Sequence, residues 1–163
     1  MHYIPDNPIV VQSDLTILLE VLSPRYAEAR DALLPFAELI KSPEYMHTWR
    51  MTSLTLWNAA ASGHTAESVL AALTRLAKYP VPESVGPQIV DRMARYGRLR
   101  LTRDGEWLRL EADSPEDLEE VRRMRQADDL LGEPVTATSL RVSPRRRGEL
   151  KQVLMSCGRP VQD

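Results

Sequence analysis

The sequence has a single cysteine, Cys157, among its 163 residues. One thiol cannot form a disulfide within the chain or build a multi-cysteine zinc or iron–sulfur site. The three histidines are scattered without the spacing of metal ligands, so we expect no metal and no cofactor. Cys157 lies in an apolar pattern near Leu154, which is typical of a small core residue rather than a nucleophile.

Aromatic residues and long apolar runs are also scarce. Only 6% of the chain is aromatic, so aliphatic residues must fill the core that its 43% hydrophobic content allows. No apolar run approaches the roughly 20 residues of a membrane span. The opening residues MHYIPDNP lack the cationic and apolar regions of a secretory leader. We therefore expect a cytoplasmic, soluble protein of one domain or two small ones, without membrane contacts.

Motifs that carry catalysis are missing as well. The sequence contains no GxxxxGK[ST] phosphate loop, no GxGxxG, no HExxH and no GxSxG. Its acidic groups fall on polar helix faces, where nothing would separate the pKa values of a catalytic pair. The sequence thus predicts no catalytic residue and no independent enzyme.

Charge is nearly balanced over the chain but not along it. The formal net charge is −2, which excludes a polycation that coats nucleic acid. Residues 86–163 nevertheless hold 15 basic side chains, mostly Arg, and many of these form two clusters. Such clusters can contact phosphates, although a solvated protein surface has the same composition. The clusters are Arg92, Arg95, Arg98, Arg100 and Arg103, and Arg141, Arg145, Arg146, Arg147 and Lys151.

The first part of the chain predicts a β-hairpin, a helix and a further strand. Two β-rich runs, residues 9–11 and 16–21, are separated by Gln-Ser-Asp. Ser23-Pro24 has the pattern of an N-cap followed by proline at the first helical position. Pro35 predicts that this helix breaks near Leu34. Residues 47–51 are expected to form a strand.

Three helices and a hairpin are expected next, over residues 53–111. The helices cover residues 53–62, 66–79 after the cap Thr65, and 83–96. The runs RLRLT and WLRLEA alternate around Asp104-Gly105, which is typical of a β-hairpin. This order indicates a winged-helix-like core, whose third helix and wing can contact nucleic acid, although many winged helices bind proteins instead. We therefore predict a first domain over residues 1–111.

Residues 112–163 are expected to form a second, small α/β lobe. A charged helix starts at Ser114-Pro115, a short strand covers residues 140–142, and Ser143-Pro144 caps a last helix. Residues 107–112 could be a strand shared by both parts. The predicted fold class is α+β: an N-terminal hairpin and helices with a winged-helix-like core, then the small lobe.

Several segments resemble one known family. VQSD, LLEV, FAELIKSPEYMHTWR, LWNAAASG, KYPVPE and RYGRLRL occur in the order found in the N-terminal region of bacterial and archaeal XPB-type DNA repair helicases. The tail LLGEPVTATSLRVSPRRRGELKQVLMSCGRP resembles the following segment, often called the damage-recognition domain. After the last glycine this resemblance predicts an aromatic residue, and the chain has Arg159 instead.

The resemblance implies an accessory region that precedes the two motor domains of an ATP-dependent 3'-5' DNA helicase or translocase acting in nucleotide excision repair. It also implies partners: the motor domains in cis and, as in relatives, another repair protein such as a nuclease or a complex subunit. The expected DNA contact, moderate to weak and through phosphates, uses Arg92, Arg95, Arg98, Arg100, Arg103, Arg145, Arg146, Arg147 and Lys151.

The alternative is a protein-interaction module with no direct DNA binding. In that case an apolar face built around Ile17, Leu19, Trp49 and Trp57 would dock a partner or a second copy of the chain.

Overall fold

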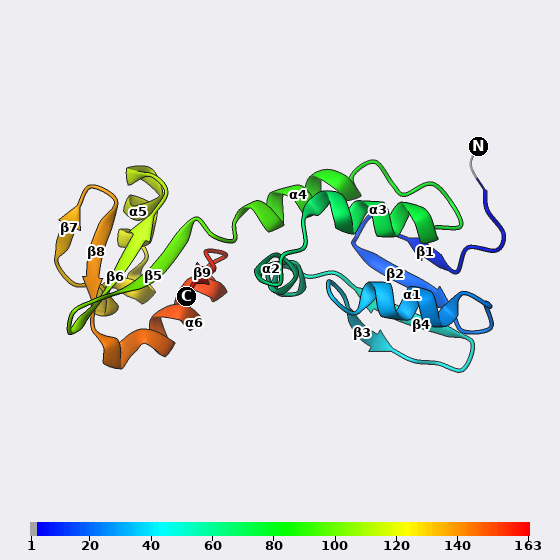
Figure 1. The fold of residues 1–163 in the computed structure, drawn as a ribbon, viewed down its shortest axis with the longest axis horizontal. Coiled ribbons are helices and arrows are strands. Elements are labelled where there is room, and N and C mark those ends of the chain that lie inside the picture. The colour runs from blue at the N-terminus through cyan, green and yellow to red at the C-terminus, as the bar shows by residue number, and fades with distance from the viewer. Residues whose placement is uncertain (1–2) are drawn as a thin grey trace. The chain divides into compact units, whose positions relative to one another are not determined.

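The computed structural model describes residues 3–163, and its chain divides into two compact units, Met1–Met93 and Ala94–Asp163 (Figure 1). Helices and antiparallel strands are mixed in both units, so the predicted α+β class is confirmed. Each unit has its own apolar core of buried side chains.

The first unit combines a sheet in the order β1-β2-β4-β3 with helices. Every neighbouring pair in this sheet is antiparallel, with Ile17 opposite Trp49 at its centre. In chain order its elements are β1 (Ile9–Val11), β2 (Thr16–Glu20), α1 (Tyr26–Leu33), β3 (Glu38–Lys41), β4 (Met46–Arg50), α2 (Ser53–Ala61), α3 (Ala66–Leu76) and α4 (Val85–Ala94), whose last residue falls just past the division.

The structure confirms the N-terminal hairpin and the break at Pro35. It also confirms the strand predicted over residues 47–51, which spans Met46–Arg50. The start of α1 differs from the prediction, because the helix begins at Tyr26 and Arg25 occupies the N-cap position without a side-chain cap. Ser23 Oγ instead accepts the Arg25 N–H at 3.1 Å, which fixes the turn before the helix. Strand β3 was not predicted from the sequence, since all four of its residues are exposed and show no alternation.

Helices α2 and α3 begin at reciprocal capping boxes. Thr65 Oγ1 accepts the Ser68 N–H at 3.1 Å, and Ser68 Oγ accepts the Thr65 N–H at 3.0 Å. Each bond satisfies a backbone donor that the helix itself leaves unpaired. From α3, Val69 and Leu73 reach the core of the first unit, as their helical spacing predicted.

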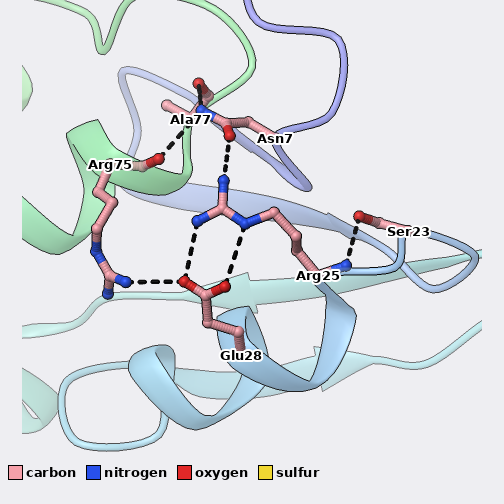
Figure 2. A network of polar contacts seen from close by, with 6 residues as sticks. All are labelled: Asn7, Ser23, Arg25, Glu28, Arg75 and Ala77. Carbon is pink, nitrogen blue, oxygen red and sulfur yellow. Dashed lines mark hydrogen bonds and ion pairs between the residues drawn. The ribbon is translucent and has the colours of Figure 1, made fainter.

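A polar network ties the N-terminal segment to α1 and α3 (Figure 2). Asn7 is 3% exposed, and its amide donates to the carbonyl oxygens of Arg75 at 3.1 Å and Ala77 at 2.9 Å. Its oxygen accepts from Arg25, whose guanidinium also forms two bonds to the carboxylate of Glu28. The hydrogen bond from Arg25 holds the pKa of Glu28 below its ordinary value.

The second unit contains a sheet in the order β7-β8-β6-β5-β9 together with helical segments. The β5–β6, β6–β8 and β7–β8 pairs are antiparallel, and β9 joins β5 in parallel. Its elements after α4 are β5 (Leu99–Asp104), β6 (Trp107–Ala112), α5 (Pro115–Arg122), the 3₁₀ turn η1 (Arg125–Leu130), β7 (Pro134–Thr136), β8 (Ser139–Val142), the 3₁₀ turn η2 (Pro144–Arg146), α6 (Arg147–Ser156) and β9 (Val161–Gln162).

The division at residues 93 and 94 lies upstream of the predicted domain boundary at 111 and 112. The β5–β6 hairpin, expected as the wing beside three helices, is the centre of the second unit's sheet, because β6 pairs with β8 and β5 with β9. The sequence predicted the hairpin and, as residues 140–142, the strand β8, but not their pairing, and β9 has only two residues. The hairpin therefore belongs to the second unit, and residues 53–111 are not one compact piece.

Candidate nucleic-acid interface

The sheet of the second unit has one apolar face and one polar face. Leu101, Leu110 and Leu140 lie opposite one another on neighbouring strands and are buried in the core with α5 and α6. Because side chains alternate along a strand, the residues between them point to the other face. That polar face carries Arg100, Thr102 and Asp104 of β5, Trp107, Arg109 and Glu111 of β6, and Ser139 and Arg141 of β8.

Most cations on the polar face are held by carboxylates. Arg109 pairs with Asp104 at 3.1 Å, and a second nitrogen lies 3.8 Å from Glu111. At the other end of the strands, Arg100 pairs with Asp113 at 2.6 Å. Arg141 is exposed, and within residues 3–163 its guanidinium has no hydrogen-bond or ion-pair partner. The face therefore presents Arg141 as its available positive charge.

The second arginine cluster surrounds the last residue of the chain. Arg147 and Lys151, one turn apart on α6, both bind the carboxylate of Asp163, Lys151 at 3.1 Å. Partial burial raises the pKa of Asp163, but these two hydrogen bonds outweigh burial and hold that pKa below its ordinary value. Arg146 is occupied by Glu149 at 2.9 Å. Arg145 is exposed, without an ionic partner in the described residues.

The structure brings one member of each arginine cluster together. Arg103, at the end of β5, and Arg147, at the start of α6, line the same hollow of about 150 Å³ beside the hairpin turn. Gly105 in that turn has φ +62°, the left-handed conformation that glycine adopts most readily. Arg103 itself is exposed, and its guanidinium has no partner within residues 3–163.

The remaining arginines of the first cluster differ in unit, exposure and sheet face. Arg92 is half-buried on α4, in the first unit, whereas Arg95 and Arg98 are exposed and belong to the second. Arg100 and Arg103 are three residues apart on β5 and so point to opposite faces of the sheet. Arg100 and Arg103 therefore do not lie on one face of this sheet.

The four apolar residues expected to dock a partner lie inside the first unit. Ile17 and Leu19 are fully buried, and Trp49 and Trp57 are 3% and 6% exposed. Trp57 also donates its indole N–H to the carbonyl oxygen of Arg92 at 2.9 Å. This burial excludes them from an exposed face: Ile17, Leu19 and Trp49 belong to the core of the first unit, and Trp57 is buried on α2.

One prominent surface residue was not among the predicted site residues. Trp107 is 45% exposed at the start of β6. The signal was present in the sequence, because Trp107 is out of phase with Leu108 and Leu110, and strand alternation places such a residue on the other face. Trp107 lines the hollow with Arg103 and a second hollow of about 260 Å³ with Arg141.

Other kinds of site find little support in residues 3–163. No group of three or more His, Cys, Asp or Glu side chains there could hold a metal ion. None of the helices in that range is long and apolar enough to cross a membrane. Cys157 is half-buried, and Arg159, in place of the aromatic that the resemblance predicted, pairs with Asp117 and Glu120.

Comparison with known proteins identifies the class to which this chain belongs. The family described as helicase conserved C-terminal domain matches residues 9–136. This match covers most of the chain, so the chain belongs to that family.

The relatives are DNA helicases of one type. The chain is 47% identical over 159 residues to the DNA 3'-5' helicase XPB of Kineococcus radiotolerans, an alignment that covers 97% of this chain and 28% of that protein. It is 45% identical over 159 residues to the corresponding helicase of Mycobacterium tuberculosis, covering 97% of this chain and 29% of that protein. The resemblance to XPB-type DNA repair helicases is thus confirmed, and the chain spans less than a third of the length of these two relatives.

A more distant relative carries a second description. The general transcription and DNA repair factor IIH helicase/translocase subunit XPB of Schizosaccharomyces pombe is 35% identical over 95 residues, or 58% of this chain and 11% of that protein. The helicase subunit of a eukaryotic repair factor is therefore similar to part of this chain.

Proposed function

We propose that this chain is the N-terminal, non-catalytic accessory region of an XPB-type ATP-dependent 3'-5' DNA helicase, and that it acts in DNA repair. Its second unit contacts DNA phosphates, while its first unit docks partner proteins that regulate the motor. The partners proposed are DNA, the motor domains in cis, and a further repair protein such as a nuclease.

One observation carries the DNA contact. Within residues 3–163, Arg103, Arg141 and Arg145 of the second unit are exposed, and no carboxylate binds their guanidinium groups. An arginine already held by an aspartate must give up that partner before it neutralises a phosphate. The three unpaired arginines can bind phosphate without this cost, whereas Arg100 and Arg147 cannot.

The test is fluorescence anisotropy of a labelled forked DNA titrated with the chain. Each phosphate contact contributes about 0.9 to the salt slope on duplex DNA, so three contacts predict a slope of about 2.7. Raising the salt from about 50 to about 200 mM should then weaken binding by about 40-fold. No binding of micromolar protein at the lower salt would contradict the DNA contact.

A charge-matched pair of variants shows whether the contact is local. Replacing Arg103, Arg141 and Arg145 together by Gln should remove most of the salt slope. The control is the same replacement of Arg122, Arg123 and Arg125, which lie at the end of α5, at its C-cap and at the start of η1, and which changes the net charge equally. Equal losses in both variants would indicate general electrostatic attraction rather than the proposed contacts.

A purely protein-binding role is favoured by one feature of the first unit. Strand β3 is an outer strand of its sheet, and Leu39 and Ile40 are 47% and 41% exposed. An open strand edge can pair with a strand of another protein. Under this alternative, Ile40→Lys would abolish partner binding or a dimer seen by light scattering, while DNA binding would be absent in the wild-type chain.

A further inference from the structure

Trp107 differs from the other two tryptophans of the chain. Trp49 and Trp57 are buried in the first unit, whereas almost half of Trp107 is exposed on the second unit's sheet. Leaving a large indole in water forgoes the stabilisation that burial provides. An exposed indole on a rigid strand, next to a two-residue turn, is held where a flat ligand can reach it.

The surroundings of Trp107 are hollowed on two sides. One hollow contains Arg103, Glu106 and Arg147 beside the indole, and the other contains Arg141 and Glu133. Arg141 lies diagonally across from Trp107, because Arg109 pairs with Arg141 in the β6–β8 register. An aromatic ring thus stands between two recesses, each of which has an arginine without an ionic partner in the described residues.

The charges of these recesses are mixed rather than uniformly positive. A site for phosphate alone gains nothing from Glu106 and Glu133, which repel anions. The edge of a nucleobase carries both hydrogen-bond donors and acceptors, so carboxylates beside arginines suit it. An aromatic surface, a mixed polar lining and available cations together match the components of single-strand recognition.

We propose that Trp107 is a stacking platform for an unpaired base of single-stranded DNA, with Arg103 and Arg141 binding the phosphates on either side of that base. This inference rests on the DNA contact proposed above and specifies its substrate. Bases in a duplex are already stacked on both faces, so only an unpaired base can place its ring on the indole.

The experiment compares single-stranded and duplex oligonucleotides of equal length, binding to the full chain at low salt. Stacking on one base contributes a factor of about 5 to 150 to the affinity. Trp107→Ala should therefore weaken single-strand binding at least about 5-fold, with little effect on duplex binding. Trp107→Phe should retain most of the affinity because the ring is kept, and the salt slope should not change because no charge is removed.

Tryptophan emission gives a second, direct readout. Since Trp49 and Trp57 are buried, single-stranded DNA should quench mainly Trp107, and the quenching should disappear in Trp107→Ala. Met155→Ala is the matched control, since Met155 is 40% exposed on α6 of the same unit. This variant should bind single-stranded DNA as the wild-type chain does. Far-UV circular dichroism confirms that each variant remains folded.

Three results would overturn the stacking site while leaving the proposed DNA contact intact. The first is salt-dependent binding of forked DNA together with unchanged single-strand affinity in Trp107→Ala. The second is an equal loss of affinity for duplex and single strands in Trp107→Ala, and the third is unchanged tryptophan emission when single-stranded DNA binds. Each would assign Trp107 to another role, such as contact with a protein. Absence of binding to any DNA at low salt would instead refute the DNA contact itself, and the stacking site with it.

Discussion

Asn7 offers the clearest test of how the first unit is held together. Its buried amide donates two hydrogen bonds to the carbonyl oxygens of Arg75 and Ala77, at the end of α3, and its oxygen accepts from Arg25 on the approach to α1 (Figure 2). Asn7→Ala removes all three bonds and leaves the two carbonyl oxygens without this donor.

The expected loss follows from these contacts. A hydrogen bond contributes about 0.5–1.5 kcal/mol net, and a buried partner left unpaired costs about 1–3 kcal/mol. Losing the two hydrogen bonds from the Asn7 amide to buried or partly buried carbonyl oxygens should therefore lower the free energy of unfolding by about 2–3 kcal/mol. With a urea m-value of about 1–3 kcal/mol/M, the unfolding midpoint should fall by about 0.7–3 M.

The assay must report the first unit alone, because a chain with two units need not unfold in one step. Trp49 and Trp57 both lie in the first unit and Trp107 in the second. In a Trp107→Phe background, tryptophan emission therefore follows unfolding of the first unit only. Urea titrations of this background with and without Asn7→Ala give the difference directly.

Ser23→Ala is the matched control in the same network. It removes a single bond, from the Arg25 N–H to Ser23 Oγ at 3.1 Å, and should cost about 1 kcal/mol or less. A loss below about 0.5 kcal/mol for Asn7→Ala, or equal losses in the two variants, would refute the reasoning that the buried amide joins these segments.

Two further predictions concern the pH dependence of stability and the room for a Cβ atom at two glycines. The lowered pKa of Glu28, caused by the hydrogen bond from Arg25, stabilises the fold above the unfolded-state pKa, and this contribution is lost as the pH falls through the folded-state pKa. Glu28→Gln should therefore lower the thermal midpoint at pH 7 and have less effect near about pH 3, below the ordinary pKa of Glu. An equal change of the midpoint at the two pH values would contradict a stabilising ion pair between Arg25 and Glu28. A Cβ on Gly132 would lie 2.7 Å from the Arg141 carbonyl oxygen, so Gly132→Ala should cost about 1–3 kcal/mol by urea unfolding. Gly148→Ala, in open space within α6, should be neutral or stabilise by up to about 1 kcal/mol, and a loss as large as that of Gly132→Ala would refute the steric argument.

Local signals in the sequence determined many of the elements. Thr65 caps α3 as predicted, and α5 begins at the predicted Ser114-Pro115, where Ser114 is the side-chain cap, because capping depends on residues three positions apart. Pro35 ends α1 for an equally local reason, since proline has no backbone N–H with which to continue the helical hydrogen bonds. The β5–β6 hairpin follows from alternation around its turn.

Long-range pairing decided where those elements belong. The short strands β3, β7 and β9 have too few residues to show a period, and they form because an existing sheet edge offers hydrogen-bond partners. The same pairing assigns the predicted wing to the second unit. Apolar character alone also could not tell whether Trp49 and Trp57 face a partner or the chain's own core, since burial is favourable in both places.

The sequence by itself determined the family, the α+β class and the presence of arginine clusters, because these depend on residue identity and local order. Only the tertiary structure decided which arginines are available. Asp113 and Asp163 neutralise Arg100 and Arg147 through contacts that no spacing along the chain would indicate. Coulombic attraction acts over a few ångströms in space, so the fold selects which charges remain free to meet a ligand.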